Sequence, residues 1–478
     1  MMSQVDKKNK LIPNDWASTK LDCVVNIVRG VTYKKDQASD FFVAGYLPVI
    51  RANNIQNDKL ILSDFVYVDA NIIKCTQKIK KNDIIVAMSS GSKSVVGKTA
   101  KAESDLDAAF GAFCGLLRPS SLIIPEMIGF YTRSAYYRNK VSELSAGANI
   151  NNLKPAHFCE LDFPLPPLAE QKEIAGQLDT LLAQVEATQA HLARIPDIIK
   201  LFRQSVLSAA VSGKLTEEWR ELNKGVERWR LVELKEAAEI IDPHPSHRTP
   251  KAVDGGVPYI GIGDLKLDGS IDFENSRKVS FDVLKEHNER YTLKAGDFIF
   301  GKIGTLGKAT ILPIGIDYTL SANVILIQPI EHVATPEYLQ FFLSSPSTLN
   351  EIAKQANSTS QAAFGIKKMR TFQCKLPNKE EQNEIVRRVE QLFAYADRIE
   401  QQAKAAKERV DKLTQAILAK AFRGELTADW RAANPDLISG DNSAAALLAR
   451  IQAERATAKP RKRASKPTIS PTSSGVTQ

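Results

Sequence analysis

The clearest pattern along the chain is a regular spacing of apolar residues between Ile385 and Ile417, with charged residues between them. The apolar positions alternate at intervals of four and three residues: Ile385, Val389, Leu392, Ala396, Ile399, Ala403, Ala406, Val410, Leu413 and Ile417. An average period of about 3.5 residues predicts a helix that winds around a partner helix as a left-handed coiled coil. At about 1.5 Å per residue, this helix would form a rod of roughly 50 Å.

A second stripe with the same spacing lies 211 residues earlier and predicts the partner helix within the same chain. Only Thr188 departs from its apolar pattern, and Pro196 is expected to kink the helix or interrupt its hydrogen bonding. Each stripe is followed by a glycine, Gly213 or Gly424, which favours a left-handed C-terminal cap. The residues assigned to the helix interfaces are Leu178, Leu181, Val185, Leu192, Ile199, Phe202, Val389, Leu392, Ile399, Val410, Leu413 and Ile417.

The duplication extends beyond the two stripes without a gap. The repeated residues are Glu170-Gln171, Leu181, Gly213, Leu215-Thr216 and Trp219-Arg220 in the first copy, and Glu381-Gln382, Leu392, Gly424, Leu426-Thr427 and Trp430-Arg431 in the second. Duplicated halves predict pseudo-two-fold symmetry. This symmetry suits a DNA site made of two half-sites.

Each helix is preceded by about 150 residues in which short apolar runs are broken by Gly, Asn and Asp, a pattern that predicts a domain of mixed α/β structure. The two segments echo each other faintly, for example at Pro48-Val49-Ile50 and Pro258-Tyr259-Ile260. The expected divisions are a first domain at 1–163, a helix at 164–215, a second domain at 216–375, a helix at 376–426 and a C-terminal segment at 427–478.

Composition narrows the class of protein only modestly. A formal charge of +9 and a pI near 9.1 favour a polyanionic partner such as nucleic acid. Part of the excess lies between Arg450 and Lys466, where seven Lys or Arg and one Glu among Ala, Pro and Ser predict a disordered tail. No run approaches the ~18 apolar residues of a membrane span, and the polar N-terminus indicates a cytoplasmic protein. The five scattered cysteines support neither a disulfide framework nor a zinc site.

The sequence contains only partial or weak matches to several catalytic motifs. Gly97-Lys98-Thr99 ends like a phosphate-binding loop, but Ser92 stands where the first glycine is required. Asp254 with Asp264-Leu265-Lys266 resembles a metal-dependent nuclease motif in a setting of turns, and His244 and His247 have no third ligand nearby. The Asn/Asp-Pro-Pro-aromatic motif of adenine methyltransferases does not occur. We therefore assign no catalytic residue and no metal ligand.

Polar loops rich in Arg, Asn, Gln, Ser and Lys recur at similar points of both halves. Arg, Asn and Gln can form paired hydrogen bonds with guanine or adenine, and small residues with Lys can approach a phosphate backbone. The candidate DNA-binding residues are Arg51, Asn53, Asn54, Gln56, Ser90, Ser92, Lys93, Lys98, Asn149, Asn151, Asn152, Lys154, Lys302, Thr305, Lys308, Ser358, Thr359, Ser360, Gln361, Lys367 and Lys368.

The chain closely resembles the specificity subunits of type I restriction-modification systems, and among them the K-type, or type IA, members. The resemblance lies in Pro167 to Gln171 and Glu380 to Gln382 at the helix starts, and in GKLTEEWR and GELTADWR at their ends. The first domain adds RGVTYKK, IRANNIQN, AMSSGSKSVVGK and SAGANINN. The resemblance covers nearly the whole chain and is weakest from about residue 240 to residue 375.

This resemblance implies a non-catalytic subunit with two target recognition domains held apart by an antiparallel helix pair, each reading one half of an asymmetric, interrupted DNA site. Two modification subunits would bind S-adenosylmethionine and methylate adenine, and two restriction subunits would use ATP and Mg²⁺ for translocation and cleavage. The chain itself would bind no cofactor. The residues leave two alternatives: a stand-alone restriction enzyme, which would need the missing catalytic motifs, and a two-headed coiled-coil scaffold or DNA-binding protein outside restriction-modification.

Overall fold

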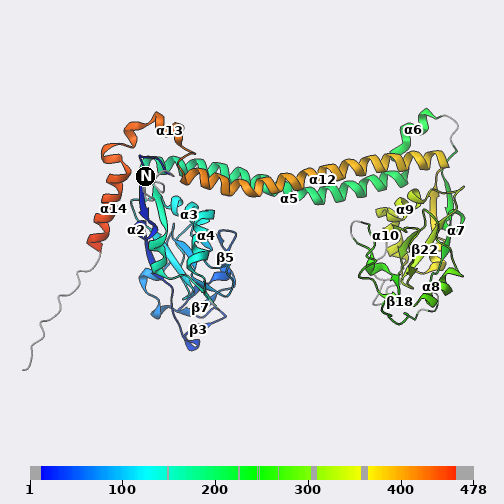
Figure 1. Cartoon of the computed structure of the whole chain (residues 1–478), viewed down its shortest axis with the longest axis horizontal. Coiled ribbons are helices and arrows are strands. Elements are labelled where there is room, and N and C mark those ends of the chain that lie inside the picture. Colours follow the sequence, from blue (N-terminus) through cyan, green and yellow to red (C-terminus); the bar gives the residue numbers. More distant parts are fainter. Residues whose placement is uncertain are drawn as a thin grey trace, which may run out of the picture. The chain divides into compact units, whose positions relative to one another are not determined.

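The computed structural model describes residues 12–147, 150–223, 227–244, 246, 248–266, 269–302, 309–356 and 364–458. The chain forms two compact units, one of residues 1–190 with 407–478 and one of residues 191–406. Each unit contains one mixed α/β domain together with part of each long helix, α5 (Leu168–Ser212) and α12 (Lys379–Phe422) (Figure 1).

The domain of the first unit is built on two four-stranded sheets. The first sheet is antiparallel, in the order β10 (Thr99–Lys101), β8 (Ile84–Ala87), β12 (Cys114–Pro119) and β2 (Val25–Arg29). The second has the order β11 (Ala109–Phe110), β4 (Tyr46–Ile50), β7 (Val66–Asp69) and β3 (Ala38–Ser39), and its β11–β4 pair is parallel. All four residues of β8 are buried, as expected of a continuous apolar run.

Smaller elements complete this domain. The strand pairs are β1 (Ala17–Lys20) with β14 (Asp162–Leu165), β5 (Ile55–Gln56) with β6 (Lys59–Leu60), and β9 (Ser89–Ser90) with β13 (Asn151–Asn152). The helices are α2 (Leu21–Val24), α3 (Pro125–Arg133) and α4 (Ala135–Leu144). The hydroxyl of Ser134 accepts a hydrogen bond from the Tyr137 N–H and so caps α4.

The domain of the second unit repeats this architecture. Its antiparallel sheet has the order β16 (Ala238–Ile241), β22 (Val324–Pro329), β19 (Phe298–Gly301) and β20 (Thr310–Ile311). The other sheet has the order β18 (Lys278–Val279), β17 (Val257–Ile260) and β21 (Thr319–Leu320), again with one parallel pair, β17–β21, and β15 (Arg230–Glu233) pairs with β23 (Gln373–Leu376). Its helices are α7 (Leu234–Ala237), α8 (Phe281–Asn288), α9 (Pro336–Ser344), α10 (Pro346–Gln355) and α11 (Ile366–Arg370). The predicted mixed α/β class and its duplication are confirmed.

The two long helices run antiparallel within each unit. In the first unit, Leu178 near the start of α5 shares a core with Leu418 near the end of α12, and the Gln189 amide donates to Asp411 at 2.8 Å. In the second unit, Leu207 near the end of α5 shares a core with Val389 near the start of α12. The heptad residues are therefore used for packing inside this chain.

Two details of the helices differ from the apolar pattern. Leu413 was expected at the interface but is 45% exposed, whereas Leu418 and Ala421 further along α12 are buried in the core of the first unit. Leu181 is half-buried, and its neighbour Leu182 is buried instead. The α5 helix continues through Pro196, so the proline does not end it. Gly213 and Gly424 have φ angles of 82° and 72°, which confirms the predicted left-handed caps.

The residues after each helix fold back onto the start of the other. In the first unit, Thr427 and Arg431, which lie before and within α13 (Ala428–Ala433), bind Glu170 of α5. In the second unit, Thr216 and Arg220, which lie before and within α6 (Glu217–Leu222), bind Glu381 of α12. The repeated Glu, Thr and Arg of the sequence therefore form the same buried cluster twice.

The C-terminal segment continues as a helix, α14 (Ala444–Ala458), that belongs to the first unit. Leu447 and Ile451 enter the core, and Glu454 accepts hydrogen bonds from the hydroxyls of Ser120 and Ser121. The expectation of disorder from Arg450 is therefore wrong for residues 450–458. Among the described residues, no helix is long and apolar enough to cross a membrane.

Candidate nucleic-acid interface

The first predicted contact loop follows β4 and is held by Asn54. The Asn54 amide donates to the carbonyls of Ile61 and Ser63 at 3.0 and 2.7 Å, and its oxygen accepts from the Arg51 N–H at 2.9 Å. The side chain is 2% exposed. Asn54 thus stabilises the loop from inside. The prediction that its amide faces DNA is wrong, because the side chain is buried.

Asn53 and Gln56 of this loop are exposed, and Arg51 is half-buried. The carboxylate of Asp64 accepts from the Arg51 guanidinium at 3.2 Å and from the Asn53 amide at 2.8 Å, and the Gln56 amide donates to the Asn53 carbonyl at 2.9 Å. The Asp64 side chain is 76% exposed. An anionic partner would compete with this carboxylate for the same two donors, so Asp64 orients the loop before a partner arrives.

The second and third predicted loops meet through the short pair β9–β13. Ser90 lies opposite Asn151, the Ser90 hydroxyl accepts from the Ser92 N–H at 3.1 Å, and the Asn151 amide donates to the Gly91 carbonyl at 3.4 Å. Lys93 is exposed and Lys98 is half-buried on the same segment. Asn152 and Lys154 are exposed beside them, and Asn149 lies outside the described residues.

A turn between β11 and β12 connects these loops with the first. Its Gly111 N–H donates to the Ile50 carbonyl at 2.9 Å, directly before Arg51. Its Phe113 carbonyl accepts from the N–H groups of Met88 and Ser89 at 2.8 and 3.2 Å. All three candidate loops therefore gather around one turn, whose own residues the sequence analysis did not single out.

The second unit repeats this framework with different side chains. The Ser321 N–H donates to the Ile260 carbonyl at 2.8 Å, as Gly111 does to Ile50. The Lys302 N–H donates to the Asn323 carbonyl at 2.9 Å, as Met88 does to Phe113. The Gly261 N–H donates to the Asp264 carboxylate at 2.7 Å, where Arg51 donates to Asn54.

Several candidates of the second unit are placed differently from the expectation. Lys302 is 9% exposed, and its ammonium group pairs with Asp242 at 3.2 Å, so it supports the fold from inside. Lys367 is exposed, and the Lys368 ammonium donates to the Gln355 carbonyl at 2.5 Å. The remaining candidates, Thr305, Lys308, Ser358, Thr359, Ser360 and Gln361, lie outside the described residues.

The motifs that resembled enzyme sites serve as structural turns. Gly97 has a φ of 76°, and the Thr99 hydroxyl is buried against that of Thr132 at 3.0 Å. Asp264 caps its own turn. His244 is buried and its Nδ1 lies 2.7 Å from Nε2 of His287, while His247 is outside the described residues. Among the described residues, no group of three or more His, Cys, Asp or Glu is placed to hold a metal.

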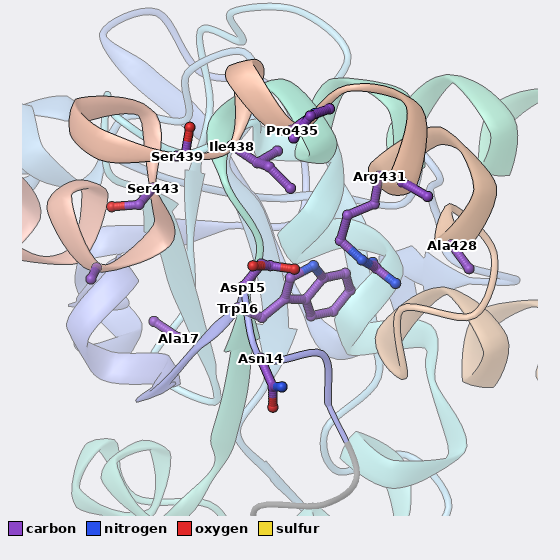
Figure 2. A pocket seen from close by; sticks show the side chains of 12 residues that line it. Asn14, Asp15, Trp16, Ala17, Ala428, Arg431, Pro435, Ile438, Ser439 and Ser443 are labelled. Carbon is purple, nitrogen blue, oxygen red and sulfur yellow. The ribbon is translucent and has the colours of Figure 1, made fainter.

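A cavity of about 620 Å³ in the first unit lies beside the cluster at the start of α5. Trp16 and Arg431 line it, and Figure 2 shows the guanidinium group next to the indole ring. Arg431 binds Glu170 and the Trp16 indole N–H donates to the same carboxylate at 2.8 Å. Because the Trp16, Arg431 and Glu170 side chains already form hydrogen bonds with one another, we assign the cavity to the packing at the start of α5 and not to a ligand.

The sequence matches the family described as "Type I restriction modification DNA specificity domain" over residues 13–197 and again over residues 226–408. The chain belongs to this specificity family. It is 46% identical over 453 residues to the EcoKI specificity subunit of Escherichia coli strain K12, covering 93% of this chain and 96% of that one. It is also 46% identical over 462 residues to the StySPI specificity subunit of Salmonella potsdam, with the same two coverages.

Two solved structures share the fold of this chain. The HsdS subunit of Thermoanaerobacter tengcongensis gives a TM-score of 0.56 at 19% identity, covering 87% of this chain and 98% of that chain. A chain from a study of complex assembly and conformational transition of the type I R-M system gives 0.60 at 19% identity, covering 87% and 99%. The predictions of the family, of its type IA membership and of a non-catalytic subunit agree with the family match and with the EcoKI and StySPI relatives.

Proposed function

We propose that this specificity subunit reads an asymmetric DNA site in two halves, one with each recognition domain, and directs adenine methylation or ATP-dependent cleavage by partner subunits. The observation that carries the proposal is the repeated loop framework. The same backbone hydrogen bonds hold the turn at Gly111 in the first unit and at Ser321 in the second, while the side chains on that framework differ. Two readers of one architecture with different surfaces suit two different half-sites.

In the first domain, we assign base contacts to the half-buried Arg51 and the exposed Asn53 and Gln56, whose donors and acceptors match base edges in the major groove. Phosphate contacts fall to Lys93, Lys98 and Lys154 and to the serines and asparagines of the paired loops, Ser90, Ser92, Asn149, Asn151 and Asn152. In the second domain the contacts would come from Lys367, Lys368 and the candidates within 303–308 and 357–361.

The partners in this proposal are two modification subunits and two restriction subunits in the cytoplasm. The heptad residues of α5 and α12 pack against each other, so docking would use the outward, charged faces of the helices. S-adenosylmethionine, ATP and Mg²⁺ would be bound by the partner subunits.

The test is to express the chain with a cognate modification subunit in a host lacking other methyltransferases and to map modified adenines across the genome. We expect one interrupted motif with two fixed half-sites. The purified chain alone should show no methyltransferase, nuclease or ATPase activity. Modification without a fixed motif, or turnover by the purified chain alone, would contradict the proposal.

A further inference from the structure

One apolar residue lies on the turn that joins the candidate loops. Phe113 is 70% exposed there, and Leu62 and Ile150 are exposed apolar residues of the neighbouring loops, at 54% and 59%. A single exposed apolar residue is ordinary on a protein surface. What sets Phe113 apart is its position, because its carbonyl binds the start of the Ser89 segment and Gly111, two residues earlier, binds the end of β4.

The backbone of the turn that carries the Phe113 ring is held by hydrogen bonds. Its backbone is bonded on both sides, at the Gly111 N–H and at the Phe113 carbonyl. Cys114 begins β12 directly afterwards and is buried. The phenyl ring thus projects from a rigid base, and a rigid aromatic loses little conformational entropy when it contacts a partner.

The second unit carries an amide at the same backbone position. Asn323 precedes Val324 of β22 as Phe113 precedes Cys114 of β12, and its carbonyl accepts the equivalent hydrogen bond from the Lys302 N–H. The Asn323 Oδ1 accepts from the Ile262 N–H at 3.2 Å and from the Ser321 hydroxyl, which places the amide oxygen against the loop that follows β17. One structural position therefore offers a hydrocarbon surface in one domain and a polar amide in the other.

We propose that this turn position determines specificity in both domains: Phe113 reads a base of the first half-site by apolar contact, and Asn323 occupies the corresponding reading position for the second. The inference rests on the proposed function. Thymine offers a methyl group in the major groove that apolar side chains contact, whereas the NH2 group of an amide donates to an acceptor on a base edge. The paired domains can thus read different bases without any change in backbone.

The test compares Phe113→Ala with the control Phe41→Ala in the full chain assembled with its modification subunit. Phe41 is a phenylalanine of similar exposure, 80%, that lies before β4, whereas the interface loop follows β4. The five residues of β4, a strand roughly 16 Å long at about 3.3 Å per residue, lie between the segment of Phe41 and the interface loop. Binding is measured on a DNA library in which each base pair of both half-sites is varied.

We expect Phe113→Ala to lower preference at one or two adjacent base pairs of the first half-site by about tenfold, the scale of one lost base contact. The second half-site and the salt dependence of binding should stay unchanged, and Phe41→Ala should match the wild type. Phe113→Asn, which installs the amide of the second domain, should change the preferred base at the affected positions.

The outcomes separate this inference from the proposed function. If the wild-type assembly selects two half-sites while Phe113→Ala selects the same bases equally strongly, the turn does not read DNA. A uniform loss of affinity for all sequences would also overturn the inference, because it indicates a general contact. Failure of the wild-type assembly to select any sequence would instead contradict the proposed function. Thermal unfolding of both variants checks that the fold is intact.

Discussion

The hydroxyl of Thr427 donates a hydrogen bond of 2.6 Å to Glu170, a carboxylate 257 residues earlier in the chain. The second copy repeats this bond, from Thr216 to Glu381 at 2.7 Å. In both places an arginine one turn later binds the same carboxylate and also the carbonyl of the capping glycine. The start of each long helix is therefore fixed by the residues that follow the end of the other.

The two clusters differ in one hydrogen bond, which gives a matched prediction. The Trp16 indole N–H donates to Glu170 at 2.8 Å, whereas among the described residues the buried Trp229 N–H and the Glu381 Oε2 have no partner. Both rings lie beside an arginine. We expect Trp16→Phe to lower the free energy of unfolding by roughly 1.5–3 kcal/mol, the value of a bond to a charged group, and Trp229→Phe to cost much less. Urea unfolding of the full chain measures both, and equal losses would contradict the assignment.

A second prediction concerns acid stability. Burial, with the neighbouring His244 as a smaller cause, lowers the pKa of His287 to about 4. The ordinary value of about 6.5 applies in the unfolded chain, so unfolding takes up a proton between these two pH values. Stability from the neutral ring is complete above pH 6.5 and is lost as the pH falls toward 4. The groups around the ring are His244, Tyr291, Thr319, Glu286 and Arg290.

The variant His287→Gln removes this titration while keeping a polar side chain. We expect the wild type to lose about 2–3 kcal/mol more than the variant between pH 7 and pH 4. Unfolding free energies measured at intervals across this range provide the comparison. Parallel pH profiles for the two proteins would show that His287 has the same pKa in the folded and the unfolded chain, and would contradict the prediction.

The loop after β4 provides a third prediction, which separates support from contact. Asn54→Ala removes the hydrogen bonds to the Ile61 and Ser63 carbonyls and should lower stability by about 1–3 kcal/mol. Gln56→Ala removes an exposed side chain, so stability should stay unchanged while preference within the first half-site weakens. Thermal unfolding and selection from a DNA library distinguish the two effects. Equal behaviour of the variants would contradict the division of roles.

The sequence predicted the features of the fold that depend on neighbouring residues, and it missed features that depend on contacts between distant parts of the chain. The coiled coil was readable because its period is local, and the caps at Gly213 and Gly424 follow from backbone conformation alone. Leu418 and Ala421 were missed and Leu413 was misplaced, because the end of α12 packs into the core of the first domain, which the spacing along the helix does not show. The tail was misjudged because its composition is polar, yet Leu447 and Ile451 find a surface made by the first domain.

The candidate site was predicted by residue type but not by role. Asn54 and Lys302 have the chemistry of DNA contacts, and only long-range partners, the Ser63 carbonyl and Asp242, show that they serve the fold. Phe113 was missed because an apolar residue after a strand reads as core. Aligning the two halves on the β4–β11 and β17–β21 pairs would have exposed the contrast with Asn323.

A fourth prediction tests the charge on the paired loops. Lys93 is exposed on the segment that begins at β9 and is assigned to a phosphate. Lys93→Ala should weaken binding to all duplexes and reduce the slope of log affinity against log salt by about one. Lys172→Ala, an exposed lysine on α5 outside the loops, is the control and should leave the slope unchanged. Loss of preference at particular bases in Lys93→Ala would instead assign this lysine to a base.

The last prediction concerns the helix pair as a spacer. Gln189 of α5 contacts Asp411 of α12, so heptads inserted after Gln189 and before Asp411 lie opposite each other and keep every other pair in register. Seven residues preserve the four-three spacing, and at about 1.5 Å per residue they add roughly 10 Å. This length corresponds to about three base pairs at ~3.4 Å each.

We expect the lengthened protein to modify the same two half-sites with a gap longer by about three base pairs, as mapped by sequencing of modified adenines. The added DNA also rotates one half-site about the helix axis by roughly 100°, since a turn takes about 10.5 base pairs. If the protein does not follow this rotation, affinity should fall while the half-site sequences persist. Inserting seven residues into α5 alone leaves α12 too short to pair along its whole length, so this variant should disrupt the helix pair. An unchanged gap with full affinity in the doubly lengthened protein would show that the helices do not set the spacing.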